Sequence, residues 1–80
     1  MDDLEIVQRI GRLADEERAL EQAHAGKELS DDDVARLRSV EVALDQCWDL
    51  LRQRRARRNA GQDPDEAEVR RADVVEGYRQ

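Results

Sequence analysis

Two stretches of this chain repeat their apolar residues at alternating steps of three and four, and a short polar segment separates them. The first stretch lies within residues 3–25 and the second within residues 31–59. Side chains at such steps share one face of an α-helix. The pattern therefore predicts two helices, and a link of about five residues predicts that they fold back as an antiparallel hairpin. The first series is Ile6, Ile10, Leu13, Glu17, Leu20 and His24, and the second is Val34, Leu37, Glu41, Leu44, Trp48, Leu51 and Arg55.

Start and stop signals support both helices. Asp2 is followed three residues later by Glu5, which is the spacing of a capping box, and Gly26 is the residue type that most easily ends a helix in a left-handed conformation. Ser30 stands before three aspartates, which favour the positive end of a helix dipole. No glycine or proline follows until Gly61, so we expect a long second helix.

The register of the hairpin follows from counting away from a turn near residue 27. This places Ile6 opposite Trp48, and we expect the indole to close the open end of the hairpin as a core residue. Glu17 and Glu41 then occupy positions in the seam where leucine would be expected.

Ion pairs could hold the two seam glutamates. We expect Glu17 to turn toward Arg38, and Glu41 toward Arg9 or Arg12. Polar interruptions of this kind can fix the register of paired helices at some expense of stability.

The chain has a net charge of −6, but residues 52–58 contain five arginines and no acid. We expect this run to lie where the second helix extends beyond the first, near the acids that begin the first helix, because cations are favoured in the last turns of a helix. The alternative is a nucleic-acid-associated protein that binds a polyanion through these arginines. Nucleic acid is the weaker alternative, because the basic surface is small, lacks interleaved aromatic residues and belongs to an acidic chain. The residues concerned are Arg52, Arg54, Arg55, Arg57 and Arg58.

Residues 62–80 form an acidic C-terminal part that follows the hairpin of residues 1–61. Residues 63–66, Asp-Pro-Asp-Glu, have the pattern of a capped short helix that could fold back over the arginines. Val74, Val75 and Tyr78 are too sparse to define an element. Two outcomes stay open for them, docking as an arm on a partner or remaining loose.

The apolar residues exceed what one hairpin seam needs. Val7, Gly11 and Ala14 form a second stripe on the first helix, and further apolar residues widen the arc on the second helix. An 80-residue chain with a single cysteine lacks the usual internal staples, so these stripes predict an all-α hairpin that dimerises into a four-helix bundle with coiled-coil-like crossings. The alternative is a marginal monomer whose long charged side chains cover the stripe. The residues that widen the arc are Val40, Ala43, Cys47 and Leu50. The expected oligomer or partner interface comprises Ile6, Val7, Ile10, Gly11, Leu13, Ala14, Leu20, Val40, Leu44, Cys47, Trp48 and Leu51.

Metal and catalytic chemistry find little support. Glu21 and His24 have the Glu-x-x-His spacing that, in pairs, builds di-iron sites in helix bundles, but a histidine at the end of a helix more often caps it. The sequence has no glycine-rich phosphate loop and no nucleophile elbow, so we expect no enzymatic activity, no cofactor and no metal. Cys47 cannot form an internal disulfide, and no apolar run is long enough for a signal peptide or a membrane span, so we expect a cytoplasmic protein with a reduced thiol.

The sequence LDQCWDLLRQRRARR at residues 44–58, followed by AGQDPD at residues 60–65 and VEGY at residues 75–78, resembles a family of small, mostly actinobacterial proteins known as domain of unknown function 2630. The likeness covers nearly the whole chain. It implies a bacterial cytosolic origin and a shared helical architecture, and it carries no catalytic or binding residue. Together with the residue patterns, it favours a small protein-interaction or regulatory module that acts as a homodimer, with an unidentified protein partner as a further option.

Overall fold

The computed structural model describes residues 1–77, and its first element is helix α1, Asp3–Ala23. Asp2 caps the helix as predicted, because its side chain accepts a hydrogen bond from the Glu5 backbone N–H and the Glu5 side chain accepts one from the Asp2 backbone N–H. The helix ends two residues before the predicted end. The chain turns at Gly26, whose φ of 74° lies in the left-handed region that favours glycine.

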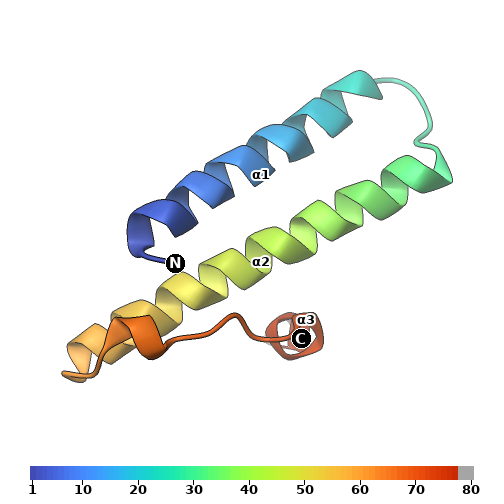
Figure 1. Cartoon of the computed structure of the whole chain (residues 1–80). Coiled ribbons are helices and arrows are strands. Elements are labelled where there is room, and N and C mark those ends of the chain that lie inside the picture. The colour runs from blue at the N-terminus through green and yellow to red at the C-terminus, as the bar shows by residue number, and fades with distance from the viewer. Residues whose placement is uncertain (78–80) are drawn as a thin grey trace.

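Helix α2, Asp31–Asn59, has the predicted bounds. Ser30 caps it by accepting a hydrogen bond from the Asp33 backbone N–H at 3.2 Å. The predicted antiparallel hairpin of α1 and α2 is confirmed, and Figure 1 shows α2 extending well beyond the start of α1.

The core of the hairpin joins Ile6 and Ile10 of α1 to Cys47 and Leu50 of α2. Ile6 is fully buried, with 0% of its surface exposed. The inward face of α2 therefore carries Val40, Cys47 and Leu50, which are all buried. This face is rotated by one residue from the predicted seam, which contained Glu41 and Trp48.

The prediction that Trp48 closes the hairpin as a core residue is wrong, because 48% of its surface is exposed. Successive residues on a helix point about 100° apart, so a seam through Cys47 turns Trp48 to the flank of α2. The predicted ion pairs of Glu17 with Arg38, and of Glu41 with Arg9 or Arg12, are also wrong. Neither glutamate forms a salt bridge within residues 1–77, whereas Glu16 pairs with Arg36 across the helices.

The C-terminal segment, residues 60–77, runs back along α2 (Figure 1). Gly61, with a φ of 73°, reverses the chain after α2. The short 3-10 helix η1, Pro64–Glu66, and the helix α3, Ala72–Glu76, both pack on α2. Val75 anchors α3, since only 4% of its surface is exposed. The segment thus docks on its own chain, which is neither of the two outcomes left open for Val74 and Val75, docking on a partner or remaining loose. Tyr78 lies outside the described residues.

Candidate protein-interaction surface

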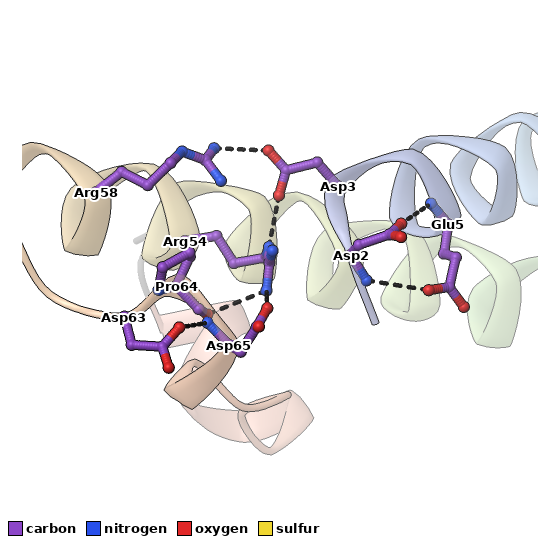
Figure 2. Close-up of polar contacts among 8 residues, drawn as sticks. All are labelled: Asp2, Asp3, Glu5, Arg54, Arg58, Asp63, Pro64 and Asp65. Atoms are coloured by element: carbon purple, nitrogen blue, oxygen red, sulfur yellow. Dashed lines mark hydrogen bonds and ion pairs between the residues drawn. The ribbon is translucent and has the colours of Figure 1, made fainter.

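Arg54 lies on the part of α2 that extends beyond the start of α1, and it joins three separate parts of the chain (Figure 2). Its Nε donates to Asp3 Oδ1 at 2.5 Å, and its Nη1 donates to the Pro64 carbonyl at 3.1 Å and to Asp65 Oδ1 at 3.0 Å. Only 5% of the arginine is exposed. Arg58 Nη2 donates to the other oxygen of Asp3, Oδ2, at 2.6 Å. We call Asp3, Arg54, Arg58 and Asp65 the Arg54 cluster.

Local structure brings the two carboxylates of the Arg54 cluster to the guanidinium. The capping box of Asp2 starts α1 so that Asp3 lies in its first turn, facing the extension of α2. On the other side, the Asp63 side chain accepts a hydrogen bond from the Asp65 backbone N–H at 2.9 Å, and this turn directs the Asp65 carboxylate toward Arg54. The sequence prediction that acids from both ends of the chain would meet the arginines is confirmed.

The electrostatics of the cluster favour its ionised form. Hydrogen bonds from Arg58 first, and then from Arg54, lower the pKa of Asp3 from 3.8 to about 2. The Asp3 carboxylate in turn raises the pKa of Arg54. Asp3 and Arg54 are therefore both charged throughout the neutral pH range.

The five arginines predicted as a polyanion contact do not form one free basic surface. Arg54 and Arg58 are bound to acids in the Arg54 cluster, and Arg57 pairs with Glu66 at 3.5 Å. Arg52 and Arg55 are exposed, and neither forms a salt bridge within residues 1–77. Three of the five positive charges are thus already neutralised within the chain.

A second set of polar contacts fastens the C-terminal segment to α2. Gln53 Nε2 donates one hydrogen to Asp49 Oδ2 at 2.9 Å and the other to the Glu68 carbonyl at 2.8 Å. Gln46 Nε2 donates to the Arg70 carbonyl at 3.2 Å, and Arg70 Nε lies 3.2 Å from Asp49 Oδ2. Asp49 is buried, and these contacts compensate its charge. The apolar spacing did not predict this set, although the seven-residue spacing of Gln46 and Gln53 on α2 could have indicated a polar face.

Trp48 lies between two hollows on the flank of α2. One, of about 330 Å³, is lined by Glu17 of α1 together with Glu41, Leu44 and Asp45 of α2. The other, of about 690 Å³, lies toward the C-terminal segment and reaches Val75. Trp48 and Asp45 line both hollows, so the indole lies where the hollow on the α1 side meets the hollow on the α3 side.

The second apolar stripe of α1 lies on the same side of the hairpin as Trp48. Arg9 lines a groove on the opposite side of the hairpin, together with Gln46 and Val69. Residues two apart lie on roughly opposite sides of a helix, so Val7 points to the side of Trp48. Val7 and Gly11 are exposed, and Ala14 is half-buried. We call this side the Trp48 face; it comprises Val7, Gly11 and Ala14 of α1 and Glu41, Leu44, Trp48 and Arg55 of α2.

The remaining residues of the expected interface divide between the interior of the hairpin and its edges. Four are buried inside the single chain. The expectation that the apolar arc of α2 from Val40 to Leu50 is left over for a partner is therefore wrong. Ala67 of the C-terminal segment also packs against part of this arc. Those four are Ile6, Ile10, Val40 and Cys47, and the partly buried residues are Leu13, Leu20 and Leu51. Cys47 is a free, buried thiol.

The turn end of the hairpin holds the only histidine, His24, in a network of its own. His24 Nε2 lies 2.6 Å from Asp33 Oδ2, and His24 Nδ1 lies 3.0 Å from the Leu20 carbonyl. Both ring nitrogens are thus engaged by protein oxygens, and the ring bridges the last turn of α1 to the first turn of α2. Glu21, the other half of the Glu-x-x-His spacing, is exposed, and within residues 1–77 no group of three potential metal ligands gathers.

Comparison with known proteins identifies the family. The sequence model of the family described as "Protein of unknown function (DUF2630)" matches residues 2–80. The chain belongs to the DUF2630 family. The resemblance inferred from residues 44–78 is thereby confirmed, and the match covers the hairpin and the C-terminal segment together.

The relatives of this DUF2630 protein include mycobacterial proteins of nearly the same length. Uncharacterized protein Rv0898c of Mycobacterium tuberculosis is 52% identical over 77 residues, which cover 95% of this chain and 88% of the relative. Uncharacterized protein Mb0922c of Mycobacterium bovis matches with the same identity and coverage. No solved structure matches the chain. Within residues 1–77, no helix has the length and apolar character needed to cross a membrane.

Proposed function

We propose that this protein is a non-catalytic, cytoplasmic protein-interaction module that acts as a homodimer through its Trp48 face. The observation that carries the proposal is the position of Trp48. The only tryptophan of the chain leaves 48% of its surface exposed beside two hollows, although burying it in the hairpin would have removed more apolar surface from water.

Exposed tryptophans set in a cleft are typical of the residues that contribute most to protein interfaces. Here the half-buried Leu44 lines the same hollow as the indole, and Val7, with 53% of its surface exposed, lies on the same side of the hairpin. Gly11 and Ala14 have the smallest side chains, so the backbone of another helix can approach α1 closely on this side. A partner that covers this face would complete a four-helix bundle.

The size of the core also supports association. The hairpin buries few large side chains, and Ile6 and Val40 are the largest that are fully enclosed among the described residues. Chains of this length rarely gain enough from one small core, and covering the Trp48 face would enlarge it. The C-terminal segment already covers a different side of α2, so the Trp48 face is the apolar surface that a partner would occupy.

Sedimentation equilibrium of the full chain from 1 to 100 μM tests the proposal. We expect the mass to rise with concentration from 9.2 kDa toward twice that value. Trp48→Ala should weaken the association at least tenfold, since truncating a central interface tryptophan commonly costs about 2 kcal/mol or more. Val69→Ala is the matched control, because Val69 is exposed but lies in the groove on the opposite side.

The fluorescence of Trp48 gives an independent readout in the same samples. Burial in an interface should shift its emission to shorter wavelength as the concentration rises. A wild-type chain that melts cooperatively and keeps a mass of 9.2 kDa over the whole range would refute the proposal. Equal weakening by Trp48→Ala and Val69→Ala would show that the interface lies elsewhere.

A further inference from the structure

The outward flank of α2 carries an acid, the tryptophan and a base at equal spacing. Glu41 stands seven residues before Trp48, and Arg55 stands seven residues after it. Seven residues are almost two helical turns, so the three side chains share one stripe. All three are exposed, and neither Glu41 nor Arg55 forms a salt bridge within residues 1–77. The stripe therefore carries opposite charges that the single chain leaves uncompensated.

We propose that a second copy of the chain packs its α2 antiparallel against this stripe, with a two-fold axis beside Trp48, so that Glu41 of each chain pairs with Arg55 of the other. The inference rests on the proposed self-association and specifies its geometry. In an isologous interface each surface patch meets its own copy. A patch that has a negative charge on one side of the two-fold axis and a positive charge at the same distance on the other side is then complementary to its own copy.

The spacing along the helix makes this orientation specific. Seven residues correspond to about 10 Å at 1.5 Å per residue, so both ion pairs form at the same distance from the axis. Leu44, four residues before Trp48, then meets Arg52, four residues after it, and the aliphatic part of the arginine can cover the leucine. A parallel arrangement would instead place Glu41 against Glu41 and Arg55 against Arg55. Repulsion between like charges thus selects the antiparallel pair.

The exposed side of α1 fits the same axis. Ile6 and Ile10 share the core cluster with Cys47 and Leu50, so Val7 lies at about the level of Trp48 along the hairpin. Leu4 stands three residues before Val7 and Gly11 four residues after it, and 65% of the surface of Leu4 is exposed. A Cβ built on Gly11 would meet nothing within 4 Å. The two-fold axis would therefore place Leu4 of one chain over the open backbone at Gly11 of the other.

Charge reversal tests the arrangement with the full chain. Glu41→Arg and Arg55→Glu should each weaken homodimerisation about tenfold or more at low salt, because each variant places two like-charged pairs across the axis. The double variant, Glu41→Arg with Arg55→Glu, restores opposite charges and should dimerise as the wild type does. Glu28→Arg, an exposed acid at the turn, is the matched control and should leave dimerisation unchanged.

Mixing the two single variants gives the decisive result. One variant carries arginine at both positions and the other carries glutamate at both, so an equimolar mixture should form a heterodimer while each variant alone stays largely monomeric. A mass tag on one variant distinguishes the heterodimer in native mass spectrometry, and circular dichroism verifies that each variant remains helical. A wild-type dimer that is insensitive to both reversals, or a mixture without heterodimer, overturns the antiparallel arrangement but leaves the Trp48 face as the interface. A monomeric wild type overturns the self-association itself.

Discussion

Replacing Val75 with threonine should detach α3 from α2, whereas the same change at Val74 should not. The two valines are neighbours in one short helix, but Val75 is 4% exposed and Val74 is 40% exposed. Threonine has the shape and the β-branching of valine, so both variants change helix propensity and volume almost equally. They differ in whether the new hydroxyl group keeps its contact with water.

The magnitude follows from the burial of Val75. Removing a hydroxyl group from water costs about 1–3 kcal/mol in proteins, and a back-bond to the carbonyl of the preceding turn would bring the cost to the lower end. Since about 1.4 kcal/mol corresponds to a factor of ten, the population of the opened segment should rise about 5- to 150-fold for Val75→Thr. For Val74→Thr, with its hydroxyl in water, we expect less than a twofold change.

Hydrogen exchange measured by mass spectrometry reads this opening directly. The backbone N–H groups of Val74 and Val75 both donate to the Arg71 carbonyl, at 3.1 and 3.2 Å, and they exchange only when α3 opens. Peptides that contain α3 should lose protection in Val75→Thr, while peptides from the core of α1 should not change. Equal exchange in the two variants would show that burial of Val75 does not hold α3 on α2.

Three further predictions concern the hairpin and the turn that follows it, each measured by chemical unfolding below the association concentration. The pKa of Asp3 is about 2 in the folded chain and 3.8 when unperturbed, so the stability that the Asp3 carboxylate contributes is complete above pH 3.8 and is lost as the pH falls toward 2. Asp3→Asn should flatten this acid-induced loss of stability. An unchanged dependence of stability on acid pH would contradict the role of Asp3. Gly61→Ala should destabilise the chain by about 1–2 kcal/mol, because alanine is strained at a φ of 73°. Ile6→Ala should cost about 2–5 kcal/mol at a side chain with 0% exposure, and Leu4→Ala, at 65% exposure, less than about 0.5 kcal/mol; similar costs for both would contradict the assigned core.

The sequence was sufficient for the helices and for the meeting of charges at the open end of the hairpin. Capping residues such as Asp2 and Ser30 act within a few residues, so their spacing alone identifies where a helix begins. The approach of Asp3 to Arg54 could also be predicted, because an antiparallel pair of helices with a short turn fixes which ends lie together. The first feature depends on residue spacing within a few positions and the second on the lengths of the helices and the turn, and both can be counted in the sequence.

The rotation of α2 about its own axis could not be read from the sequence. Two adjacent stripes of α2 are apolar, one through Val40 and Cys47 and the other through Leu44 and Trp48, and either satisfies the three-and-four spacing. The structure turns the smaller Cys47 inward, which lets α1 pack closely and leaves the bulky indole on the flank. The choice depends on how large and small side chains interlock across two helices, and this is a property of the pair.

The path of the C-terminal segment was also beyond the sequence. Two of its contacts with α2 are hydrogen bonds from Gln46 and Gln53 to the backbone carbonyls of Arg70 and Glu68. Any residue type offers such a carbonyl, so the segment carries no side-chain pattern that marks its docking site. Only the acids around Pro64 had a recognisable role, since their charge was complementary to that of the arginines.

The Arg54 cluster has a consequence for synthesis on the ribosome. Arg54 lies 51 residues after one of its carboxylate partners, Asp3, and 11 residues before the other, Asp65. The helices can pair as soon as α2 has left the exit tunnel, but at that moment the guanidinium has only its N-terminal partner. Its coordination is completed only after Pro64 and Asp65 have also emerged, so the order of translation makes completion of the Arg54 cluster a later step than the pairing of the helices.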